Sequence, residues 1–68
     1  MKICDFTMPE IEKYRALCNF TSDERKIFDT LSCGNTNEQT AEICNMGVST
    51  VKRIKNRIWT KIERIESL

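Results

Sequence analysis

The segment from Val48 to about Glu66 constrains the fold more than any other part of the chain. Its aliphatic residues recur at intervals of three and four, which is the spacing of one face of an α-helix. These positions are Val51, Ile54, Ile58, Ile62 and Ile65. A helix with one apolar face must bury that face against other elements. The pattern therefore predicts a long amphipathic helix over residues 48–66 that packs on its apolar side.

Three further helices are predicted from the way they begin. Each start has a threonine followed three residues later by Glu or Gln, the pattern in which the two side chains cap a helix reciprocally. The pairs are Thr7 with Glu10, Thr21 with Glu24, and Thr36 with Gln39. They predict helices over about residues 8–18, from Thr21 to the turn at 33–35, and from Thr36 to Cys44. Nowhere do four residues alternate convincingly between apolar and polar, so the expected fold is all-α with four helices.

The first two helices have apolar stripes of their own, and these should complete the core. The stripes are Ile11, Tyr14, Leu17 and Cys18 in the first helix, and Ile27, Phe28 and Leu31 in the second. Gly34 suits the left-handed conformation that ends many helices.

Only Asn45-Met46-Gly47 separates the third predicted helix from the fourth. Two helices that meet at a steep angle across such a short turn need one residue with positive φ and small or apolar contacts at the crossing. Asn45 can adopt the left-handed conformation, Ala41 permits a close approach, and Met46 can fill the space below the turn. Gly47 falls at the N-cap of the fourth helix.

Positive charge gathers in the fourth predicted helix, although the net charge of the chain is only +1. Residues 1–51 carry five basic and eight acidic side chains, whereas residues 52–68 carry six basic and two acidic ones. No acidic residue interrupts the series formed by Lys52, Arg53, Lys55, Arg57 and Lys61. A basic helix on a mildly acidic support is typical of a surface that approaches nucleic-acid phosphates. A merely solvated charged face is the alternative.

An ordered set of residues between positions 20 and 62 follows the pattern of a known family. The set comprises Phe20-Thr21, Glu24, Ile27-Phe28, Gly34-x-Thr36-Asn37, Ala41, Thr50-Val51-Lys52, Ile58 and Lys61-Ile62. With these positions the chain resembles the LuxR/NarL-type (GerE-like) helix-turn-helix domain, which is close in plan to the promoter-reading domain of sigma-70-like factors. The chain departs from the family's pattern at Thr40, Asn45, Gly47 and Ile54, where Ile, Gly, Ser and His are usual.

The resemblance implies one helix-turn-helix domain over residues 1–68, with an extra N-terminal helix within 1–19, a core over 20–62 and a C-terminal extension over 63–68. It also implies a sequence-specific DNA-binding regulator of transcription whose helix 48–66 enters the major groove as a long C-terminal recognition helix. The family usually adds a further helix for dimerisation after the recognition helix. Here an additional helix precedes the motif instead.

The face of the fourth helix opposite its apolar stripe supplies the candidate site. At about 100° per residue, Lys52, Arg53 and Asn56 gather there with hydroxyl side chains. Arg and Lys suit the edge of guanine, and Asn suits the edge of adenine. We expect base contacts from Val48, Ser49, Lys52, Arg53 and Asn56. We expect phosphate contacts from Thr36, Asn37, Lys55, Arg57 and Thr60, the first two because amides at the start of a helix favour anions.

A second copy of the chain is also an expected partner, and a protein-binding role is the alternative to DNA binding. The core of so short a chain is small, and the apolar stripe extends past the matched motif. This favours a homodimer through Trp59, Ile62, Ile65 and the first helix. The alternative to DNA binding is a small protein-interaction module, or an inhibitor of a transcription component, that uses the first helix and Trp59.

Other classes of function find little support in the residues present. The chain has no histidine, no glycine-rich phosphate loop and no paired carboxylates in an apolar setting, so we expect no catalytic residues. Cys4, Cys18, Cys33 and Cys44 form no C-x-x-C pair, so we expect no metal or other cofactor and treat Cys18 and Cys44 as buried apolar residues. There is no apolar run long enough to span a bilayer and no signal segment, so the expected location is cytoplasmic.

Overall fold

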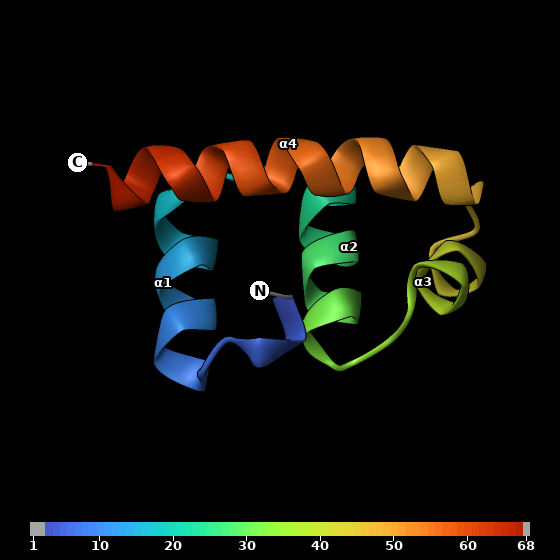
Figure 1. The fold of residues 1–68 in the computed structure, drawn as a ribbon, viewed down its shortest axis with the longest axis horizontal. Coiled ribbons are helices and arrows are strands. Elements are labelled where there is room, and N and C mark those ends of the chain that lie inside the picture. Colours follow the sequence, from blue (N-terminus) through green and yellow to red (C-terminus); the bar gives the residue numbers. More distant parts are fainter. Residues whose placement is uncertain (1–2, 68) are drawn as a thin grey trace.

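The computed structural model describes residues 3–67 and contains four α-helices and one short 3₁₀ helix (Figure 1). The elements are η1 (Ile3–Asp5), α1 (Met8–Leu17), α2 (Ser22–Ser32), α3 (Asn37–Ile43) and α4 (Val48–Glu66). No strand occurs within residues 3–67, so the predicted all-α class is confirmed. The predicted domain also includes residues 1, 2 and 68, which lie outside the described part, as does the side chain of Cys4.

Reciprocal caps set the starts of the first three α-helices. Each threonine hydroxyl accepts a hydrogen bond from the amide three residues on, and the Glu or Gln side chain accepts one from the amide of the threonine. In α1, for example, Glu10 Oε1 lies 2.9 Å from the Thr7 nitrogen. α4 begins at Gly47 without a side-chain cap. These local bonds explain why the helix starts could be predicted.

Left-handed residues end three of the helices, and the first of them, Asn19 after α1, has φ of 52°. Gly34 follows α2 with φ of 94°, and Asn45 follows α3 with φ of 55°, as predicted for both. The amide of Met46 donates to the carbonyl of Ala41, and that of Asn45 donates to the carbonyl of Glu42. These two bonds are the pair that closes a helix at a left-handed residue, and they turn the chain from α3 into α4.

α4 runs along the molecule, whose longest extent is 33 Å. Figure 1 shows α1 and α2 standing across α4, with α1 near its C-terminal end, and α3 near its N-terminal end. All three helices therefore lie on one side of α4, and its opposite side faces solvent. The buried residues include Ile11, Tyr14 and Cys18 from the first helical stripe, Ile27, Phe28 and Leu31 from α2, Ala41 from α3, and Val51, Ile54, Ile58 and Ile62 from α4.

For one residue of the first helix, the prediction that it lies in the core is wrong. The side chain of Leu17 is 54% exposed, whereas Ile11, Tyr14 and Cys18 are buried. At 100° per residue, Leu17 points about 90° away from the centre of the face that those three residues share. Leu17 therefore stays at the edge of the helix that faces solvent.

The N-terminal segment covers the far end of α4. The rings of Phe6 and Tyr14 have their centroids 5.0 Å apart, and Phe6 lies 5.6 Å from Trp59. The Tyr14 hydroxyl donates to the Glu66 carboxylate at 2.5 Å. Ile62 is consequently only 3% exposed, so the expectation that it forms surplus apolar surface for a homodimer is wrong. The chain covers this part of the stripe with its own residues.

Candidate nucleic-acid interface

The outer face of α4 presents most of the side chains expected to contact bases. Ser49, Lys52, Arg53 and Asn56 are exposed, because Val51, Ile54 and Ile58 hold the opposite face in the core. Val48 differs from the rest, since it is half-buried and packs against the core. Four of the five expected base-contacting residues are thus accessible together. We call the exposed residues 49, 52, 53, 56, 57 and 60 the outer face of α4.

The cations on and beside this face form no ion pair with the residues that the structure describes. The ion pairs found within residues 3–67 join Lys13 to Glu66, Arg15 to Asp29 and Lys61 to Glu24. None of them involves Lys52, Arg53, Lys55 or Arg57. These four cations are therefore available to an anionic partner without breaking a contact within the described part of the chain.

Lys61 has a different role from the other basic residues of α4. Its Nζ lies 2.5 Å from Glu24 Oε1 and 3.4 Å from the carbonyl oxygen of Asn19. The side chain of Glu24 is only 6% exposed, so the pair ties α4 to the start of α2 below the surface. Lys61 therefore belongs to the framework and adds no free charge to the outer face.

The pKa of Glu24 reflects this contact. Burial alone would raise the pKa of its carboxyl group. The hydrogen bonds from Lys61 and from the amide of Thr21, together with the positive charge of Lys61, lower the pKa on balance below its ordinary value. Glu24 is thus held as a carboxylate that anchors both a helix cap and the long helix.

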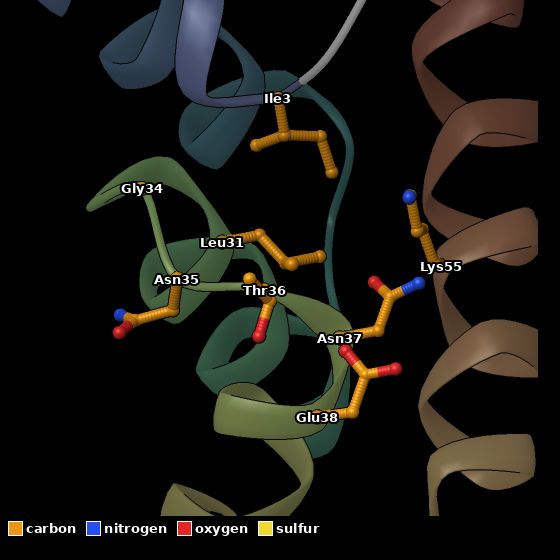
Figure 2. A pocket seen from close by; sticks show the side chains of 8 residues that line it. All are labelled: Ile3, Leu31, Gly34, Asn35, Thr36, Asn37, Glu38 and Lys55. Atoms are coloured by element: carbon orange, nitrogen blue, oxygen red, sulfur yellow. The ribbon is translucent and has the colours of Figure 1, made fainter.

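Three of the expected phosphate-contacting residues lie around one cavity of about 310 Å³ between α3 and α4 (Figure 2). Thr36 and Asn37 line it from the start of α3, and Lys55 lines it from α4. The Thr36 hydroxyl already accepts a hydrogen bond from the Gln39 amide at 3.1 Å. Glu38 lines the same cavity, and its carboxylate opposes an anion there. Thr36 and Asn37 were predicted from the amides at the start of the helix, whereas the effect of this acidic neighbour was not predicted.

The other two expected phosphate-contacting residues belong to the outer face itself. Arg57 and Thr60 are both exposed. The Thr60 hydroxyl donates to the Asn56 carbonyl at 3.0 Å, so its oxygen is oriented by its own helix. Apart from the half-buried Val48, the expected residues therefore form an outer group on α4 and a smaller group at the junction of α3 and α4.

Glu63 limits how far the basic surface extends along α4. It is exposed, and at 100° per residue it falls between the directions of Lys52 and Asn56. Its carboxylate would repel a phosphate beyond Thr60. The direction of Glu63 follows from the helical spacing of the sequence alone, so this limit could have been predicted. The usable surface covers roughly the first three turns of α4.

The structure describes the side chains of Cys18, Cys33 and Cys44. Within the described part of the chain, no three side chains of Cys, Asp or Glu gather as ligands would. Cys18 is buried, Cys44 is half-buried against the core and Cys33 is exposed. Burial raises the pKa of the Cys18 thiol, which suits an apolar role.

Comparison with known proteins gives no relative for this chain, because no protein-family model, curated protein or solved structure matches it. None of the helices within residues 3–67 combines the length and apolar character needed to cross a membrane. The function is therefore inferred from the geometry of the chain itself.

Proposed function

We propose that the protein is a helix-turn-helix regulator of transcription that binds double-stranded DNA by inserting α4 in the major groove. The observation that carries the proposal is the outer face of α4, where exposed cations without ion pairs surround an amide and hydroxyls. An α-helix fits the width of the major groove, and these groups match the donors and acceptors on base edges.

The position of α4 in the molecule supports the same proposal. Its inner face is held by Val51, Ile54 and Ile58, all of which are buried against the other helices. A helix supported in this way can present its outer face without losing much backbone freedom on binding. The tight turn at Asn45 sets α3 beside the N-terminal end of α4, where Lys55 and Asn37 can position the helix on phosphates.

Within this proposal the side chains divide by role. Arg53 and Asn56 are the main readers of bases, because both are exposed near the centre of the outer face. Lys55 and Arg57 lie to either side of that centre and contact phosphates. The Glu24–Lys61 pair holds the framework and does not contact DNA.

Affinity measurements on single variants test these roles. The DNA is a duplex enriched from a random pool by the parent protein, and binding is followed by fluorescence anisotropy. Replacing Arg53 or Asn56 with Ala should cost about 1–3 kcal/mol on this duplex and relax the preference for its sequence. Replacing Lys55 or Arg57 should weaken binding to all duplexes similarly.

Arg25→Ala serves as the matched control, since Arg25 is an exposed arginine on α2, away from the outer face. It should leave the affinity unchanged. Equal binding by the parent and by both the Arg53 and Asn56 variants would show that α4 does not read the bases.

A further inference from the structure

A second surface lies between α1 and the C-terminal half of α4. It is a cavity of about 340 Å³ with aromatic and aliphatic walls and an acidic rim. Its lining residues are Phe6, Glu10, Tyr14, Trp59, Ile62, Glu63 and Glu66. We call it the acidic aromatic groove. The groove lies toward the C-terminal end of α4, whereas the basic surface covers roughly the first three turns of that helix.

The aromatic wall of the groove suits a cation. Trp59 is half-buried and meets Phe6 edge to face, with centroids 5.6 Å apart. Indole attracts cations more strongly than the other aromatic rings. The protein already places one cation against this cluster, since Lys13 Nζ lies 5.6 Å from the centroid of the Tyr14 ring. Within residues 3–67, however, no cation of the chain lies over Trp59.

The rim of the groove retains one carboxylate that the protein does not use. Glu66 accepts hydrogen bonds from Tyr14 and Lys13, and Glu10 caps the start of α1 through Thr7. Glu63 makes no side-chain hydrogen bond or ion pair with the described residues. Trp59 and Glu63 are four residues apart, so they lie one turn apart on the same side of α4. The Trp59 ring and the Glu63 carboxylate, neither of which has a charged partner among the described residues, are thus neighbours on α4.

We propose that the acidic aromatic groove binds an arginine side chain from an exposed basic and apolar segment of a partner protein. A guanidinium group can stack on the Trp59 ring while it donates two hydrogen bonds to the Glu63 carboxylate. Apolar neighbours of that arginine would cover the exposed part of Trp59 and Phe6. Nucleic acid is a poorer occupant, because three carboxylates line the groove and repel phosphates.

Trp59 supplies the readout for a direct test, because it is the chain's only tryptophan. The probe is a synthetic peptide in which arginine alternates with leucine, titrated into the full chain while tryptophan fluorescence is recorded. A matched peptide carries glutamate in place of arginine. Glu63→Gln is the test variant. Glu42→Gln is the control, because Glu42 is exposed on α3 outside the groove.

The arginine peptide should change the emission of Trp59 and saturate below about 1 mM, a weak but specific affinity. Glu63→Gln should weaken this binding about fivefold, as expected for the loss of one exposed charge pair. Glu42→Gln should have no effect, and the glutamate peptide should not bind.

Three results would overturn the proposal. The first is an emission that the arginine peptide leaves unchanged, and the second is equal binding by the parent and Glu63→Gln. The third is a shift that depends on the concentration of the protein alone and disappears in Glu63→Gln, because the occupant would then be a second copy of the chain. None of these results bears on DNA binding, which is measured with duplex DNA.

Discussion

Thr40 places a hydroxyl group in the middle of the core. Its side chain is fully buried, and its Oγ1 has no hydrogen-bond partner among residues 3–67. A buried polar atom without a partner loses its bonds to water and gains nothing in return. Thr40 is therefore a residue that weakens the core of the chain.

Replacing Thr40 with Val should therefore stabilise the protein. Val has nearly the same shape but no polar atom, and the free energy of unfolding should rise by about 1 kcal/mol. For a chain of this size that corresponds to an increase in Tm of roughly 4–8 °C. Thr30→Val is the control, because the Thr30 hydroxyl donates to the Lys26 carbonyl at 2.7 Å and its loss should bring no gain. An unchanged or lower Tm for Thr40→Val would show that the hydroxyl group has a partner.

Glu24 gives a second prediction at the scale of a residue. Its pKa is lowered in the folded protein, so the ion pair with Lys61 stabilises the fold when pH is above the unfolded pKa of about 4.3. This stability is lost as pH falls through the lower folded pKa, because the folded state must then take up a proton. In melts from pH 7 to pH 2, Glu24→Gln should be less stable than the parent at pH 7, and the difference should shrink toward low pH. Glu12→Gln, an exposed carboxylate on α1, should follow the parent. A parent and a Glu24→Gln variant of equal stability at pH 7 would contradict this role.

At the scale of elements, local signals explain how much of the fold could be predicted. The capping boxes at Thr7, Thr21 and Thr36 are sequence-local, so the starts of three helices were predictable. η1 was missed because three residues carry no periodic pattern. The exposure of Leu17 follows from its direction on the helix, so spacing alone could have predicted it. The covering of Ile62 by α1 and Phe6 is a long-range property that no spacing within α4 specifies.

The start of α4, which has no side-chain cap, gives a prediction at the scale of elements. Gly47 is its N-cap with φ of −74°, which any residue can adopt, and a Cβ built there meets no atom nearer than 4.0 Å. Gly47→Ser should add a capping hydroxyl and restrict the unfolded chain, so the free energy of unfolding should rise by about 0.5–1 kcal/mol. Gly34→Ser should have the opposite effect. The φ of 94° at this position is strained for serine, so the substitution should lower stability. Denaturant melts measure both changes, and a destabilised Gly47→Ser variant would mean that the cap site is obstructed.

For the whole molecule, the packing of α1 and Phe6 changes what the long helix can do. The expected homodimer depended on apolar surface that one chain could not cover, yet Ile62 is buried and Trp59 and Ile65 are half-buried. With this end of α4 occupied inside the chain, the exposed side of α4 is the basic outer face. The outer group of the candidate site could be predicted, because helical periodicity shows which residues lie opposite the apolar stripe of α4. The framework role of Lys61 could not, because Glu24 lies 37 positions away in the sequence.

The most direct test of DNA binding by α4 is the salt dependence of affinity for the enriched duplex and for a scrambled duplex of the same composition. Four cations that form no ion pair within residues 3–67 lie on or beside the outer face, so log K should fall linearly with log salt concentration with a slope between roughly −2 and −4. Lys55→Ala or Arg57→Ala should reduce the slope by about one unit each. The enriched duplex should bind more tightly than the scrambled one at every salt concentration. An affinity for neither duplex at 50 mM salt, or one that does not change with salt, would contradict DNA binding by the outer face of α4.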